Sequence, residues 1–135
     1  MEILSSRVLL RPSDPAASRR FYRDVLGLAI YREFGDPANP STVFFLGSGL
    51  LEVSGAGEDV DPRGLSLWMQ VRDVYAEFAR LQDAGVTILR EPKQEFWGLI
   101  EMWIADPDGI NIVIVQIPDD HPLRRDQRDL DQMRK

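Results

Sequence analysis

Few side chains in this sequence could do acid–base, nucleophilic or metal chemistry. The 135 residues include no cysteine and one histidine, His121. This composition excludes disulfide frameworks, thiolate metal sites, iron–sulfur clusters and cysteine nucleophiles, and also any site that needs two imidazoles from one chain. Because His121 lies between Asp120 and Pro122 in a charged stretch, we interpret it as a surface residue. The sequence assigns no catalytic residue.

Aromatic side chains form the second group that could have a function, because they can stack on flat ligands. The chain has three tryptophans and six phenylalanines, most of which we expect in the core. The formal charge of −6 disfavours nucleic acid and anionic membranes as partners, and it mildly favours cationic or neutral ligands. No apolar run reaches the length of a membrane span and no export signal is present, so we expect a cytoplasmic protein.

Two copies of one structural unit must position these side chains. Gly27–Glu33 and Gly85–Glu91 share glycine, isoleucine, arginine and glutamate at an offset of 58 residues (85 minus 27). A stretch with helical periodicity precedes each glycine and begins at an aspartate, Asp14 or Asp73, which is a good N-cap residue. Glycine can adopt the left-handed conformation that ends a helix. The pattern predicts the same helix in both halves.

Alternating apolar segments separated by turn residues surround each helix. We therefore predict an α+β fold of two βαβββ modules, whose curved and mainly antiparallel sheets form a cavity. We place the first module at residues 1–56, a linker at 57–63, the second module at 64–117 and a charged tail at 118–135. The expected strands are 7–11, 28–34, 42–46 and 50–53, then 65–71, 87–89, 99–105 and 110–117.

Three motifs make the chain resemble a known family. They are the sequence SRRFYRDVLGL at Ser18–Leu28, the pair Trp97-Gly98, and the sequence DPDGIN at Asp106–Asn111. Together with the repeat they resemble the vicinal oxygen chelate superfamily, which includes glyoxalases, extradiol dioxygenases and bleomycin-resistance proteins. The resemblance covers about residues 5–117 and implies the paired-module fold. It does not by itself fix a function, because this fold hosts unrelated chemistries.

The resemblance also implies where a metal would bind, because metal enzymes of this superfamily take ligands from the first and last strands of each module. The matching positions here are Arg7 and Glu52 in the first module and Ser66 and Val113 in the second. Only Glu52 is a good metal donor, and the permanent charge of Arg7 opposes a cation. We therefore expect no metal and no other cofactor. Weak metal binding through Glu52 stays open.

Strand alternation predicts which other side chains face the cavity. If Arg7 and Glu52 both point inward, they form an ion pair on its floor. If the DPDG turn pairs Ala105 with Ile110, then Met102 shares the inward face, whereas Trp103 points to the helix-covered face. The sequence does not resolve whether Phe44 or Phe45 points inward. The predicted ligand-binding residues are Arg7, Glu52, Ser66, Trp68, Gln70, Trp97, Met102, Asn111 and Val113.

Two functions fit these features. The first is a small-molecule binding protein, similar to the bleomycin-resistance branch, that sequesters an aromatic or cationic antibiotic or metabolite without a metal. The lack of metal donors, the negative charge and the segment from Trp97 to Glu101 favour it. The alternative is an enzyme of the lyase, isomerase or dioxygenase type acting on a small oxygenated substrate. Open sheet edges predict a homodimer. The sequence leaves open the ligand, catalysis and the roles of the tail and His121.

Overall fold

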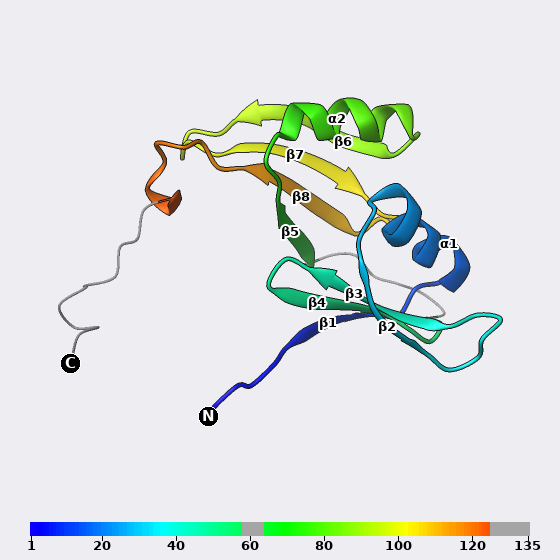
Figure 1. Cartoon of the computed structure of the whole chain (residues 1–135). Helices are drawn as coiled ribbons and strands as arrows, with labels where there is room; N and C mark the ends of the chain where they lie inside the picture. The colour runs from blue at the N-terminus through cyan, green and yellow to red at the C-terminus, as the bar shows by residue number, and fades with distance from the viewer. Residues whose placement is uncertain (58–63, 125–135) are drawn as a thin grey trace.

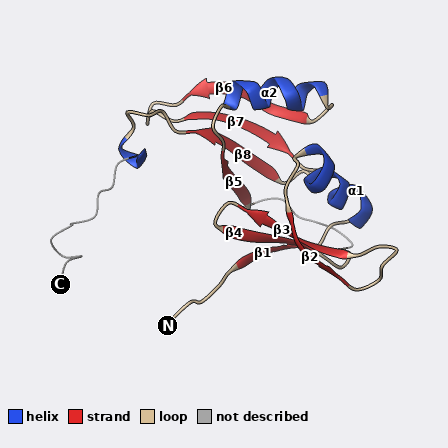
Figure 2. Cartoon of the chain, viewed as in Figure 1, coloured by secondary structure: helices blue, strands red, loops and turns tan. Residues whose placement is uncertain are grey.

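The computed structural model describes residues 1–57 and 64–124 as two four-stranded sheets, each with helices on one face (Figures 1 and 2). The predicted pair of βαβββ modules is confirmed. The first module contains β1 (Arg7–Leu10), α1 (Pro15–Arg20), the π-helical turn η1 (Phe21–Val25), β2 (Ile30–Phe34), β3 (Ser41–Leu46) and β4 (Gly49–Val53). The second contains β5 (Ser66–Gln70), α2 (Val74–Asp83), β6 (Thr87–Gln94), β7 (Ile100–Ala105) and β8 (Asn111–Gln116), followed by the 3₁₀ turn η2 (Pro122–Arg124).

Both sheets have the same mixed topology. The strand order is β1-β4-β3-β2 in the first sheet and β5-β8-β7-β6 in the second. In each module the first strand pairs in parallel with the last, and the other pairs are antiparallel. Within the described residues, β1 and β5 therefore each pair on one side only. This shared order is the structural counterpart of the sequence repeat.

The helices begin where the sequence predicts. Asp14 accepts a hydrogen bond from the amide of Ala17 at 3.1 Å, and Asp73 caps α2 in the same way. Both helical segments are followed by a glycine with positive φ, Gly27 at 75° and Gly85 at 77°. The first helix differs from expectation because it changes at Phe21 from an α-helix to a π-helix.

The core lies between the helices and one face of each sheet. Buried side chains of β5, β7 and β8, among them Met102 and Ile112, pack with Val74 and Leu81 of α2. Side chains from the first module, including Phe44, belong to the same cluster. The two modules thus share one hydrophobic core.

A buried polar contact joins the modules at their junction. The Tyr22 hydroxyl donates to Oδ2 of Asp106 at 2.7 Å, and Asp106 Oδ1 accepts the amides of Asp108 and Ile110, each at 2.9 Å. Burial is the largest influence on both titratable groups, and it raises the pKa of Tyr22 and that of Asp106. A second contact, from Ser13 to Asp108, lies beside the first. The turn at the start of DPDG therefore anchors the first helix to the second module.

Strand β6 is longer than predicted, ending at Gln94 rather than at residue 89. Its pairing with β7 is irregular between Ile88 and Arg90 and again between Arg90 and Lys93. Such bulges break the two-residue alternation by which a strand is recognised in sequence. The predicted linker and tail fall mostly outside the described residues, since 58–63 and 125–135 are not among them. No helix in the described part is long and apolar enough to cross a membrane.

Candidate functional site

The face of the second sheet opposite α2 brings together five of the predicted ligand-binding residues. In the parallel pair of β5 and β8, Ser66 lies opposite Asn111 and Trp68 lies opposite Val113, with Gln70 one row further on. Asn111 donates to the Ser66 hydroxyl at 3.1 Å. We call this surface the open face, because Ser66, Trp68 and Gln70 are exposed and Trp68 retains 51% of its accessible surface.

One row of the open face crosses all four strands. Trp68 on β5 pairs with Val113 on β8, Val113 pairs with Trp103 on β7, and Trp103 pairs with Arg90 on β6. The guanidinium carbon of Arg90 lies 4.0 Å from the Trp103 ring centroid, a cation–π contact. The Trp103 indole nitrogen is buried without a partner among the described residues. The row places one indole on each side of a valine.

The predicted face of Met102 is wrong. Ala105 pairs with Asn111 rather than with Ile110, because Asp106 and Ile110 still bond across the turn, the Asp106 amide donating to the Ile110 carbonyl at 3.0 Å. This one-residue shift exchanges the two faces of β7. Met102 is therefore fully buried beneath α2. Trp103 takes the place on the open face that we predicted for Met102.

Arg7 and Glu52 form the predicted ion pair on the corresponding face of the first sheet. Arg7 Nη1 lies 2.8 Å from Glu52 Oε1, while the Ser54 hydroxyl donates to Oε2 at 2.7 Å. Arg11 in turn donates to the Ser54 oxygen at 2.8 Å. The Ser54 hydroxyl, followed by Arg7, holds the pKa of the Glu52 carboxyl below its usual range. Phe45, 47% exposed, shares this face, and Phe44 is buried, which settles the register that the sequence left open.

Trp97 lies in the turn between β6 and β7 and reaches back to the open face. Its indole nitrogen donates to Glu101 Oε2 at 2.8 Å, and Glu101 is buried in the row beside Trp103. His121 is a structural residue rather than a free surface imidazole. Its Nε2 lies 2.8 Å from the Trp97 carbonyl oxygen, and its Nδ1 accepts the amide of Leu123. These two contacts hold the imidazole ring against the turn between β6 and β7.

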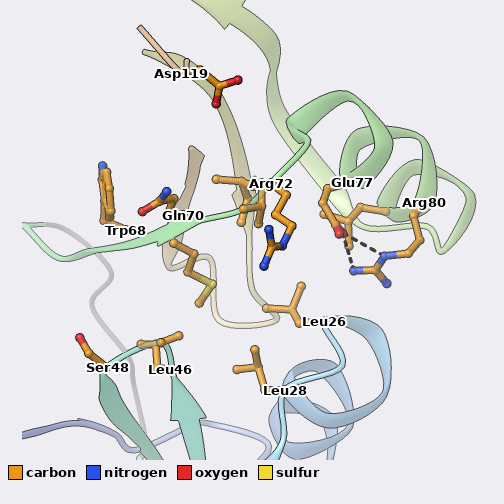
Figure 3. Close-up of a pocket in the computed structure, with 15 residues that line it drawn as sticks. Leu26, Leu28, Leu46, Ser48, Trp68, Gln70, Arg72, Glu77, Arg80 and Asp119 are labelled. Atoms are coloured by element: carbon orange, nitrogen blue, oxygen red, sulfur yellow. Dashed lines mark hydrogen bonds and ion pairs between the residues drawn. The ribbon is translucent and has the colours of Figure 1, made fainter. Parts of the chain in front are cut away.

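A cavity of about 890 Å³ surrounds the free edge of β5 (Figure 3). Trp68 and Gln70 line it on the side of the open face, and Leu28 and Leu46 of the first module line it on the other side of the strand. Arg72 from the loop before α2, with Glu77 and Arg80 from α2 itself, completes one end. Two of the nine predicted residues, Trp68 and Gln70, therefore line the cavity.

The sequence did not indicate the leucine side of this cavity or Arg72. Leu26 follows the π-helical turn and Leu28 precedes β2, so neither lies in a regular element whose periodicity shows a direction. Arg72 lies in the short loop between β5 and α2, where strand alternation ends. The only available signal was the position of this loop at the end of the first strand of the module.

Comparison with known proteins agrees with the resemblance. The model of the Glyoxalase/Bleomycin resistance protein/Dioxygenase superfamily matches residues 5–114, and the chain belongs to this superfamily. A probable lactoylglutathione lyase of Synechocystis sp. is 26% identical over 119 residues, which cover 80% of this chain and 91% of that protein.

Solved structures share the fold. The antibiotic-binding protein TnmS3 of Streptomyces sp. CB03234 superposes with a TM-score of 0.71 at 23% identity, covering 87% of this chain and 98% of that one. A superfamily member from Sphaerobacter thermophilus gives a TM-score of 0.69 at 22% identity, covering 85% and 98%. At such identities the likeness concerns the fold alone.

The residues at the metal positions of the superfamily do not fit a divalent cation. Glu52 has both oxygens engaged, by Arg7 and by Ser54, and Val113 has no donor atom. Ser66 offers a neutral hydroxyl that accepts from Asn111. Across residues 1–57 and 64–124, no group of three histidine, aspartate or glutamate side chains is placed to hold a metal ion. A positively charged arginine in this set argues further against a cation.

Proposed function

We propose that this protein binds and sequesters a flat aromatic small molecule, such as an antibiotic or a metabolite, without a metal and without converting it. The observation that supports this most directly is the row of Trp68, Val113 and Trp103. Two neighbouring strand spacings separate the tryptophan backbones by roughly 10 Å. A flat ring in van der Waals contact with both indoles needs about 7 to 8 Å. The gap between the two indoles therefore suits one aromatic ring, which would lie above Val113 and stack between Trp68 and Trp103.

The remaining predicted residues fit the same proposal as polar contacts around that ring. Ser66, Gln70 and Asn111 lie in the rows on either side, and Trp97 borders the face through Glu101. The Oδ1 atom of Asn111 is buried and unpartnered within the described residues, so it is available to a ligand donor. An aromatic surface with a few polar groups is the usual composition of a small-molecule site.

We also propose a homodimer. The outer edges of β1 and β5 are unpaired within the described chain. The face of each sheet opposite its helices exposes large apolar side chains, including Leu9, Phe45 and Trp68. Unpaired edges and exposed apolar faces favour association with a second copy. Light scattering should give twice the chain mass, and a concentration-independent mass of one chain would contradict the proposal.

Titration of the purified protein with planar antibiotics tests the binding function. Tryptophan fluorescence should change on binding, and Trp68→Ala should weaken binding about tenfold because it removes a stacking surface. Tyr75→Ala, which removes an exposed aromatic ring from α2, is the matched control and should bind normally. Equal affinity of Trp68→Ala and the wild type for every bound compound would contradict the site.

The alternative is an enzyme acting on a small oxygenated substrate, and the similarity to a probable lactoylglutathione lyase favours it. Such an enzyme would need Glu52 as a proton-transfer group and Arg7 to stabilise an oxyanion. Incubation with 2-oxoaldehydes and catechols separates the two functions. Turnover that Glu52→Gln abolishes without loss of binding would establish the enzyme and overturn sequestration.

A further inference from the structure

Three carboxylates near the cavity and on the sheet faces opposite the helices are each paired with an arginine. Glu52 pairs with Arg7, and buried Glu95 pairs with Arg90. At the end of the cavity, Glu77 pairs with Arg80 at 2.9 Å, and the same arginine donates to the Val25 carbonyl at 2.7 Å. A ligand cation would have to displace one of these arginines to reach one of these three carboxylates.

Arg72 lines the cavity and differs from these arginines. It forms no hydrogen bond or ion pair with any residue of 1–57 or 64–124, and it is exposed. The two acidic residues that follow it in sequence, at the N-cap and in the first turn of α2, are engaged elsewhere. Asp73 accepts the amides of Tyr75 and Ala76, and Glu77 is held by Arg80. Asp119, which also lines the cavity, has an interaction of its own. Within residues 1–57 and 64–124, the Arg72 guanidinium is therefore a positive charge that no carboxylate pairs with.

The surface next to this charge is apolar. Figure 3 shows Arg72 turned toward Leu26, with Leu28 and Leu46 further along the cavity wall. Trp68 and Gln70 project from the other side of β5. The leucine side of the cavity thus offers one cationic donor group beside a wide apolar wall. Guanidinium binds carboxylate, sulfonate and phenolate oxygens through paired N–H donors.

We propose that the cavity takes an organic anion with an apolar body, whose acidic group binds Arg72 and whose body lies against Leu26, Leu28 and Leu46. This inference goes beyond the proposed function, because Arg72 and the leucines lie on the other side of β5 from Trp68 and Gln70. It differs from the cationic ligand that the net charge of −6 favoured. The net charge is a property of the whole surface, whereas ligand selection depends on the charges that remain unpaired at the cavity.

Three probes with one ring system and different charges test the inference. They are naphthalene-2-carboxylate, neutral naphthalene-2-carboxamide and 2-naphthylmethylammonium, titrated into the full-length protein by isothermal calorimetry. The carboxylate should bind at least about tenfold more tightly than the ammonium, and its affinity should fall with added salt. Arg72→Gln should abolish this preference without changing the affinity for the carboxamide. Arg72→Lys should retain most of it.

Arg20→Gln is the matched control, since Arg20 is exposed on α1 and does not line the cavity. It should behave as the wild type. If all three probes bind equally, Arg72→Gln has no effect and Trp68→Ala weakens all three, then the ligand class is wrong and the binding function stands. A preference for the ammonium also overturns the ligand class. If no probe binds the wild type, the anion site at Arg72 is overturned, whereas the titration with planar antibiotics decides the binding function separately.

Discussion

The Tyr22 hydroxyl donates to Asp106 Oδ2 at 2.7 Å, and this single buried bond links the first helix to the DPDG turn 84 residues later. Tyr22 is fully buried, and Asp106 is buried with three hydrogen bonds to its carboxylate. The bond therefore ties the two modules together at their junction.

Tyr22→Phe should lower the free energy of unfolding by about 1 to 3 kcal/mol, because it leaves a buried carboxylate short of one donor. Urea denaturation at pH 7 measures the loss. Tyr75→Phe removes the hydroxyl of an exposed tyrosine and should change stability by less than about 0.5 kcal/mol. Equal stabilities of Tyr22→Phe and Tyr75→Phe would show that the bond does not hold the modules.

The effect of Tyr22→Phe should also depend on pH. Burial raises the pKa of Asp106 in the folded protein, so its ionised carboxyl costs stability above that pKa and the cost disappears as pH falls. The Tyr22 hydroxyl stabilises the ionised form. The stability gap between Tyr22→Phe and wild type should therefore be largest near pH 7 and should narrow toward about pH 4. A gap that widens in acid would contradict this assignment.

Arg90→Met should destabilise the protein by about 3 to 5 kcal/mol, because buried Glu95 then loses its counter-charge. The double variant with Glu95→Gln should recover much of the loss, as denaturation of all three proteins would show. The matched control is Arg32→Met, which removes an exposed arginine lying 5.3 Å from the Phe34 ring centroid. It should cost less than about 1 kcal/mol. No recovery in the double variant would mean that Arg90 acts mainly through Trp103.

Gly98→Ala should separate backbone strain from crowding. Gly98 has φ of 94°, and a Cβ there would lie 2.9 Å from Cδ2 of His121. Gly35 has a similar φ of 86° with open space around it. We expect Gly35→Ala to cost about 1 kcal/mol and Gly98→Ala about 2 to 3 kcal/mol in thermal unfolding. Adding His121→Ala should narrow the difference, and an unchanged difference would exclude His121 as its cause.

Glu52→Gln should reduce stability by about 1 kcal/mol at pH 7. The lowered pKa of Glu52 means that its contribution is complete above the unfolded value of about 4.3 and is lost as pH falls through the folded pKa. Wild type and variant should therefore converge once the pH lies below the folded pKa of Glu52. Glu77→Gln breaks a more exposed ion pair and should cost less than about 0.5 kcal/mol. A persistent gap in acid would place the effect in packing rather than charge.

Local signals were enough to predict the fold. The aspartate caps, the helix-ending glycines and the turn sequences act over a few residues, so the repeated unit could be recognised without knowledge of its packing. The same alternation placed Ser66, Trp68 and Gln70 on one face of β5, as the structure has them. Whether that face binds a ligand remains a prediction.

The face of Met102 and the unpaired state of Arg72 among the described residues depended on contacts that the sequence does not show. The register across the DPDG turn is fixed by the Asp106 carboxylate and its bonds to Asp108 and Ile110. A shift of one residue was enough to exchange Met102 and Trp103 between faces. Arg72 is a candidate ligand-binding residue only because Asp73 and Glu77 are engaged elsewhere. Those contacts are visible in the three-dimensional structure and not in the sequence.

The row from Trp68 to Arg90 has a consequence for how this protein could change over evolution. The Trp68, Val113 and Trp103 side chains point away from α2, so they can be replaced without altering the packing beneath that helix, whereas Arg90 is held by its pairing with buried Glu95. Because side chains alternate between the two faces of the sheet, one set of positions contributes to folding and the other set is available for ligand recognition. Single substitutions at residues 68, 103 or 113 could retune specificity while the scaffold persists, which is how one duplicated fold could come to serve many unrelated compounds.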